Sequence, residues 1–235
     1  MTRARTVGLH AKLVKLSLVV AATATLLSGC GMHPGAAVVV GDTEISGAEV
    51  DDAASALCAS TVSSAEAQGQ PKPELAARGA RQAAVQLLLD SELSRQFGEA
   101  EGIEPDQEQL SAALAQNAQG IETVPEAQRE DFIDLFRGFQ EGQLILSAAG
   151  EESLAAQGND QPSPEEVTAE GARLRTEWAR DVDVEVDPRF GDYDQGTVKP
   201  VSGSLSIPVS QRAFEGANAE PGTEWTAGLP ASQKC

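Results

Sequence analysis

The sequence predicts a mainly α-helical protein with short β-strands at the two ends of its helical region. In the long segments 73–97 and 126–154, apolar residues recur every three or four positions, which is the period of an amphipathic helix. The segments 37–46 and 182–187 are rich in valine instead, in a run or alternating with acids, as in short strands. Aromatic residues make up only 4% of the chain and alanine is abundant, so we expect helices packed through small side chains.

The first valine segment, AVVVGDTEIS at 37–46, predicts two strands around a tight turn at Gly41 and Asp42. Ser46 is followed three residues later by Glu49, a capping-box pattern that predicts the start of a helix reaching about Ser64. The residues expected on one face of this helix are Val50, Ala54, Leu57 and Thr61, with Cys58 next to that face.

Three more helices are predicted, separated by connections that contain Gly and Pro. They run from near Pro73 to Phe97, over about residues 106–118, and from Glu126 to about Leu154. The residues that mark their apolar faces are Val85, Leu88, Leu89, Leu93 and Phe97 in the first, Leu110 and Leu114 in the second, and Phe132, Ile133, Leu135, Phe136, Phe139, Leu144 and Leu146 in the third.

A last helix follows a polar link, with Ser163 as its cap, Pro164 in the first position and Glu166 completing a capping box. The residues at helical spacing along it are Val167, Gly171, Leu174 and Trp178. The alternating segment VDVEVD at 182–187 then predicts a half-buried strand. Beyond it the chain is rich in turn residues, with one more short strand expected around Ser204 to Ile207 and the remainder expected to be irregular.

The N-terminal residues 1–29 have the organisation of a signal peptide: a basic head, then 14 uncharged residues from Leu16 to Gly29. That run is too short to cross a bilayer, which takes about 20 residues. Its end, Leu27-Ser28-Gly29-Cys30, resembles the lipobox of bacterial lipoproteins. The resemblance implies cleavage before Cys30, a diacylglycerol on its sulfur, a tether at 30–36 and a place on the extracytoplasmic face of the cell membrane. The alternative is an ordinary secretory signal with an incidental cysteine.

The charge of the chain argues against a nucleic-acid partner. Without residues 1–29, 13 basic residues remain against 36 acidic ones, a net charge of −23. Nucleic acids and anionic lipids require the opposite sign, so membrane contact is expected through the lipid anchor only. The acidity is expected to keep an exported protein soluble, and the alternative is an acidic recognition surface.

Two cysteines other than Cys30 remain, Cys58 and Cys235. Thiols outside the cytoplasm tend to be oxidised, and with Cys30 lipidated these two form the only possible intramolecular pair. A disulfide between them is the favoured interpretation, with two unpaired thiols or a metal site without further ligands as the alternatives.

The sequence lacks the usual signatures of catalysis and of cofactor or metal binding. The mature chain contains a single histidine, His33, in the tether, and no Walker loop, nucleophile elbow or Cys-X-X-Cys pair. The segment DYDQG at 192–196 lacks the remainder of an EF-hand loop. Carboxylates are plentiful enough for a paired-acid glycosidase, but at this density they are expected on solvated helix faces. The sequence therefore predicts a protein that is not an enzyme and has no cofactor.

The order of these elements resembles the SurA/PrsA-like extracytoplasmic foldases and chaperones. In that family a signal or lipobox precedes a valine-rich strand, a turn with glycine and an Ile-Ser lead-in to a helix, which is Ala37 to Ser46 here. The segment VEVDPRFG, Val184 to Gly191, is similar to the one that completes the chaperone domain in actinobacterial members. The resemblance covers most of residues 37–195 and leaves 196–235 as a Gly- and Pro-rich extension.

The resemblance implies that the early and late valine strands pair in a small sheet that clasps a SurA N-terminal-like helical chaperone domain. It also implies a holdase, which binds unfolded or newly exported polypeptides without catalysis. Many members carry a parvulin-type prolyl isomerase module, but only 27 residues lie between Leu154 and Val182, so that module is expected to be absent.

Phe132, Phe136 and Phe139 are the candidates for a client-binding groove. The alternative places these rings in the core, against the apolar stripe of the 73–97 helix. Two other functions stay open: an accessory envelope lipoprotein that binds one specific partner, and a residual peptidyl-prolyl isomerase.

Overall fold

The computed structural model describes residues 33–199, 207–218 and 222–235, and Gly35–Cys235 forms one compact unit. This unit includes the C-terminal segment that the sequence sets apart as an extension. The predicted signal peptide, the predicted lipidation site Cys30 and most of the strand predicted around Ser204 lie outside the described residues.

Three short strands form an antiparallel sheet in the order β2-β1-β3. They are β1 (Ala36–Val40), β2 (Thr43–Ser46) and β3 (Val184–Val186). Val39 of β1 is paired with Glu44 on one side and with Glu185 on the other. Gly41 supplies the left-handed backbone, φ 58°, that the turn between β1 and β2 requires. The predicted pairing of the early and late valine strands is therefore confirmed.

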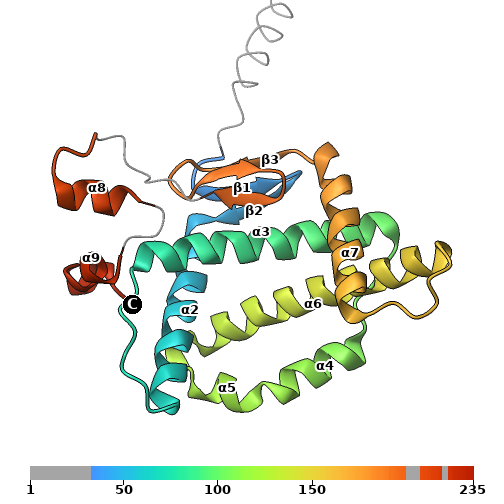
Figure 1. The fold of residues 1–235 in the computed structure, drawn as a ribbon, viewed down its shortest axis with the longest axis horizontal. Coiled ribbons are helices and arrows are strands. Elements are labelled where there is room, and N and C mark those ends of the chain that lie inside the picture. The colour runs from blue at the N-terminus through green and yellow to red at the C-terminus, as the bar shows by residue number, and fades with distance from the viewer. Residues whose placement is uncertain (1–32, 200–206, 219–221) are drawn as a thin grey trace, which may run out of the picture. The chain divides into compact units, whose positions relative to one another are not determined.

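Four long helices form the body of the fold (Figure 1). They are α2 (Gly47–Ala67), α3 (Ala77–Glu101), α6 (Glu126–Ala156) and α7 (Pro164–Trp178). α3 packs on α2, α6 and β1, and α6 packs on α7 as well. The main core joins Val38 and Val40 of the sheet to Val50, Val85, Leu89, Leu93 and Leu135 of the helices. A second cluster, of Phe97, Ile145, Leu146 and Ala149, lies between α3 and α6.

Both predicted capping boxes are present. The Ser46 hydroxyl accepts from the Glu49 amide at 3.1 Å, and the Glu49 carboxylate accepts from the Ser46 amide at 2.7 Å. Ser163 and Glu166 repeat the arrangement at 3.3 and 2.8 Å. These short side chains satisfy amides that have no partner within the helix, which fixes where α2 and α7 begin.

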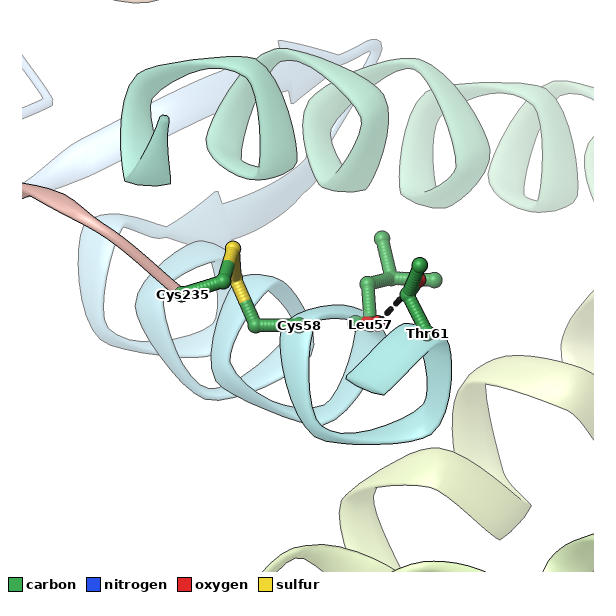
Figure 2. The surroundings of a disulfide bond; sticks show 4 residues. All are labelled: Leu57, Cys58, Thr61 and Cys235. Carbon is green, nitrogen blue, oxygen red and sulfur yellow. Dashed lines mark hydrogen bonds between the residues drawn. A yellow bond between two sulfur atoms is a disulfide. The ribbon is translucent and has the colours of Figure 1, made fainter. Parts of the chain in front are cut away.

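The sequence places three features of the helices wrongly. α3 begins at Ala77 and not near Pro73, because the chain before it is extended and Ala76 forms a β-bridge with Lys234. The helix expected over 106–118 is two helices, α4 (Gln107–Gln116) and α5 (Ala118–Thr123), which meet at Asn117. Thr61 is exposed and does not join the buried face of α2; its hydroxyl donates to the Leu57 carbonyl of the same helix at 2.8 Å (Figure 2).

The C-terminal region is more regular than the sequence predicts. Its elements are β4 (Asp192–Asp194), β5 (Thr197–Lys199), α8 (Gln211–Ala217) and α9 (Thr223–Ala227), and the 3-10 turns η1 (Ala179–Asp181) and η2 (Ala231–Gln233) precede β3 and Lys234. Gln86 of α3 fixes the β4–β5 hairpin: its amide oxygen accepts from the Val198 amide at 2.7 Å, and its amide nitrogen donates to the Gly196 carbonyl at 3.1 Å. Contacts between residues so far apart in the chain cannot be predicted from a local sequence pattern. Of the helices in the described residues, none combines the length and apolar character needed to cross a membrane.

Candidate functional site

The three phenylalanines predicted to bind clients, which we call the aromatic stripe, lie on one side of α6. Phe132, Phe136 and Phe139 are four and three residues apart, so they are neighbours on the helix surface. The rings of Phe132 and Phe136 stack at 6.3 Å between centroids, with 11° between their planes. Both are half-buried, and Phe139 is 37% exposed.

The core contacts of α6 come from other residues. Leu135 belongs to the main core together with Leu89 and Leu93, and Ile145 and Leu146 belong to the cluster around Phe97. Within the described part of the chain, these two clusters include none of the three phenylalanines. The aromatic stripe thus lies outside both core clusters, with Phe139 exposed and the other two rings half-buried.

Glycines on α6 and α7 let α6 pack closely against α3 and α7. This close packing determines which side of α6 faces its neighbours. A Cβ added at Gly142 would stand 3.1 Å from the Cβ of Ser94 on α3. A Cβ added at Gly150 would stand 2.1 Å from the Val167 carbonyl oxygen on α7. Gly171 of α7 is among the residues that the sequence pattern places at helical spacing, but Gly150 is not. A glycine in the interior of an amphipathic helix is the signal that could have identified it.

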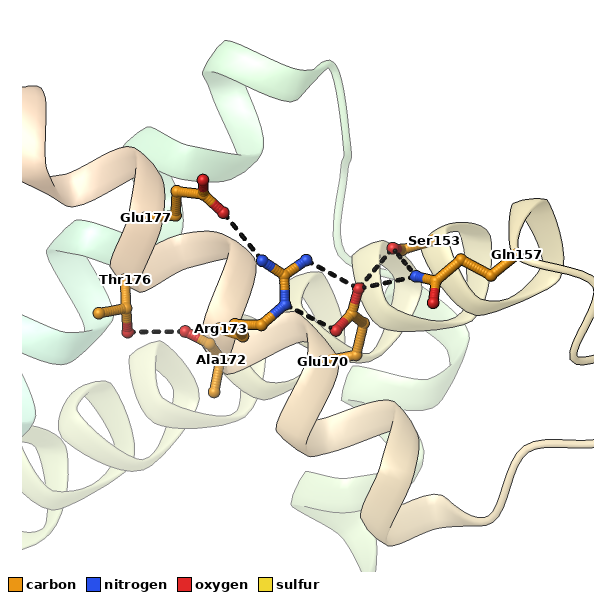
Figure 3. A network of polar contacts seen from close by, with 7 residues as sticks. All are labelled: Ser153, Gln157, Glu170, Ala172, Arg173, Thr176 and Glu177. Atoms are coloured by element: carbon orange, nitrogen blue, oxygen red, sulfur yellow. Dashed lines mark hydrogen bonds and ion pairs between the residues drawn. The ribbon is translucent and has the colours of Figure 1, made fainter.

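A network of polar side chains ties the end of α6 to α7 (Figure 3). The Glu170 carboxylate accepts from the Ser153 hydroxyl at 2.6 Å, from the Gln157 amide at 3.1 Å, and from two nitrogens of Arg173 at 2.8 and 2.9 Å. Arg173 also donates to Glu177 at 2.8 Å. The hydrogen bonds from Arg173 and Ser153 lower the pKa of Glu170 to about 2.

A cleft of about 460 Å³ lies between β2, α3 and α6. Leu88 and Ile145 are among its apolar lining residues, and Ser91 contributes a buried hydroxyl oxygen without a hydrogen-bond partner among the described residues. Arg95 lines the same cleft and is held by Glu92 at 2.6 Å and by Glu99. Arg95 therefore neutralises part of the negative charge of the acidic residues in this cleft.

The disulfide predicted from the cysteine count is present between Cys58 of α2 and Cys235 (Figure 2). The two Cα atoms are 5.1 Å apart, across a sequence separation of 177 residues. The Cys235 amide also donates to the Leu75 carbonyl at 3.0 Å, and the Lys234 ammonium donates to Glu74 at 2.7 Å. The C-terminus is thus fastened to α2 and to the segment that leads into α3.

Within the ranges that the structure describes, His, Cys, Asp and Glu side chains form no group of three or more that could hold a metal ion. Comparison of the chain with protein-family models, with curated proteins and with solved structures gives no match in any of the three.

Proposed function

We propose that the protein is a lipid-anchored extracytoplasmic chaperone of the holdase type, which binds unfolded or newly exported polypeptides without catalysis. The observation that supports this most is the aromatic stripe, three phenylalanine rings on one side of α6 that stay outside both core clusters. The resemblance of residues 37–195 to SurA/PrsA-like chaperones supports it as well, since the described fold has the helical body and the paired end strands that the family implies.

In this proposal a client polypeptide binds at the aromatic stripe without any chemical reaction. An apolar client segment that covers the rings removes apolar surface from water, which contributes about 25 cal/mol for each Å² buried. α6 is a rigid support for this contact, because it is packed against both α3 and α7. The strongly acidic surface keeps the protein and its bound client dispersed by charge repulsion.

The anchor is the second part of the proposal. Leu27 to Cys30 is the lipobox, Cys30 carries the lipid, and the residues up to Ala36 form the tether. The membrane is contacted through this lipid, and the folded unit that starts at Gly35 works on its extracytoplasmic side.

Aggregation suppression tests the holdase. The soluble form beginning at Gly31, which leaves every described helix and strand intact, is mixed with a chemically unfolded client while light scattering is followed. Suppression at near-equimolar amounts is expected, and Phe136→Ser/Phe139→Ser should abolish most of it without loss of helical circular dichroism.

The matched control is Val209→Ser/Phe214→Ser, which removes two apolar side chains that are 91% and 55% exposed elsewhere in the chain. This control should suppress aggregation like the unaltered protein. Equal loss of aggregation suppression in both variants would mean that clients bind over much of the surface and not at the aromatic stripe. No suppression at large excess would refute the holdase and favour an accessory lipoprotein with one specific partner.

A further inference from the structure

A second cleft, of about 560 Å³, lies among the C-terminal parts of α3, α6 and α7, apart from the aromatic stripe. Its apolar floor contains Phe97 and Trp178, whose ring centroids are 5.8 Å apart with 59° between the planes. Ile103 and Leu174 extend this floor. On α6 the cleft begins at Ala149, ten residues beyond Phe139, which is about 15 Å along the helix axis.

The rim of this cleft is acidic. Glu101, Glu152, Glu177 and Asp181 line it, and no Lys, Arg or His is among its described lining residues. Glu177 is paired with Arg173 at 2.8 Å (Figure 3). The other three carboxylates form no ion pair with any residue that the structure describes, so the cleft keeps an excess of negative charge.

Two other clefts in the described residues are also lined by acids without a base, but neither has an aromatic lining residue, so the aromatic floor is what distinguishes this cleft from them. Two more clefts contain bases. The cleft between β2, α3 and α6 contains Arg95. The cleft beside the disulfide contains Lys72, Arg81 and Lys234. What sets the cleft of about 560 Å³ apart is therefore the pair of aromatic rings beside its acids, and not the acids alone.

We propose that this cleft binds a Lys or Arg side chain carried by an apolar stretch of another polypeptide. A cation over the face of a tryptophan is attracted by the ring quadrupole, and Trp178 lies in the floor. The apolar stem of Lys or Arg packs along such a floor while its charged end reaches carboxylates at the rim. The volume is within the range of known ligand pockets, about 300–1,000 Å³. The inference goes beyond the holdase proposal and does not depend on the aromatic stripe.

The test uses the fluorescence of Trp178. The chain has two tryptophans, so purified full-length protein with Trp225→Phe reports on Trp178 alone. It is titrated with a capped peptide of the sequence Ala-Leu-Arg-Leu-Ala, and with the same peptide carrying neutral citrulline in place of arginine. We expect a saturable change in emission with the arginine peptide and at least fivefold weaker binding of the citrulline peptide.

Charge variants locate the binding. Glu101→Gln/Glu152→Gln/Asp181→Asn should weaken binding of the arginine peptide at least fivefold. The control, Glu122→Gln/Glu130→Gln/Glu165→Gln, removes the same net charge from exposed positions that line none of the described clefts, and its Kd should stay within twofold.

Three outcomes would overturn the inference: equal weakening by the control variant, equal binding of the citrulline peptide, or no binding of the arginine peptide by fluorescence and calorimetry. Phe136→Ser/Phe139→Ser should bind the arginine peptide as tightly as before. The holdase proposal can therefore fail in the scattering assay while this inference stands, and the reverse.

Discussion

Gly171 lies directly against the main chain of Leu146, so closely that a Cβ on the glycine would stand 1.9 Å from the Leu146 carbonyl oxygen. No side chain fits in that space without separating α6 from α7. The crossing of these two helices therefore depends on glycine at this position, as it does at Gly150 on the opposite helix.

The first prediction is that Gly171→Ala lowers the free energy of unfolding by about 1–3 kcal/mol or more, because the added methyl forces the two helices apart. Urea denaturation followed by circular dichroism measures this. Gly120→Ala is the control: nothing lies within 4 Å of the new methyl, and alanine favours a helix over glycine by about 1 kcal/mol. Equal destabilisation by both substitutions would contradict the close crossing.

The second prediction concerns the Cys58–Cys235 disulfide. Its loss in Cys58→Ser/Cys235→Ser should lower the free energy of unfolding by about 2–5 kcal/mol, since the bond restricts a long loop in the unfolded chain. Reductant should destabilise the unaltered protein by a similar amount and leave the double variant unchanged. Two free thiols in the folded protein purified without reductant, measured by alkylation and mass spectrometry, would exclude the bond.

The third prediction concerns acid. The pKa of Glu170 is about 2 in the folded protein against an ordinary 4.5, so the carboxylate stabilises the fold above pH 4.5. This contribution should disappear as the pH falls from 4.5 towards 2. Glu170→Gln should lower the melting temperature at pH 7, and the difference from the unaltered protein should close at low pH.

Glu165→Gln, which removes an exposed carboxylate from the same helix, is the control for the loss of one negative charge and should change the melting temperature at pH 7 less than Glu170→Gln does. A difference in melting temperature between Glu170→Gln and the unaltered protein that stays constant from pH 7 to pH 2 would contradict the prediction. It would mean that Arg173 and Ser153 do not lower the pKa of Glu170.

The fourth prediction concerns Gln86, which supplies both hydrogen bonds that hold the β4–β5 hairpin to α3. Gln86→Ala should leave the Val198 amide unpaired and cost about 1–2 kcal/mol, with faster hydrogen exchange at Val198. Gln82→Ala, one turn earlier on α3, should leave this exchange unaltered. Unchanged exchange in Gln86→Ala would show that the hairpin is held by other contacts.

Elements defined by local patterns could be predicted from the sequence. Both capping boxes involve residues only three apart, and the start of α2 after Ser46 and of α7 after Ser163 follow from them. The start of α3 could not be predicted, because Ala76 is extended through its bridge to Lys234, at the far end of the chain. The same holds for the C-terminal region, where Arg78 donates to the carbonyls of Gly216 and Asn218 at 2.6 and 2.7 Å.

The aromatic stripe, too, could be predicted only in part from the sequence. Spacing alone groups Phe132, Phe136 and Phe139, but a spacing pattern does not say which side of a helix meets the core. That choice is made by the contacts of Leu135 with the main core and by the close approach of Gly142 to Ser94. The cleft around Trp178 was missed because its acids come from three separate helical segments.

The bond between Cys58 and Cys235 closes residues 58–235 into a covalent ring, and the residues before Cys58 form an arm outside it. A protease that cuts once anywhere within the ring produces a nicked protein whose pieces remain covalently joined, and a fragment is released only after a second cut or reduction. One cut in the arm, between Cys30 and Gly35, releases the entire folded unit from the proposed anchor. A single cut within the ring and a single cut before Gly35 therefore have opposite results: the first releases no part of the folded unit, and the second frees all of it from the proposed anchor.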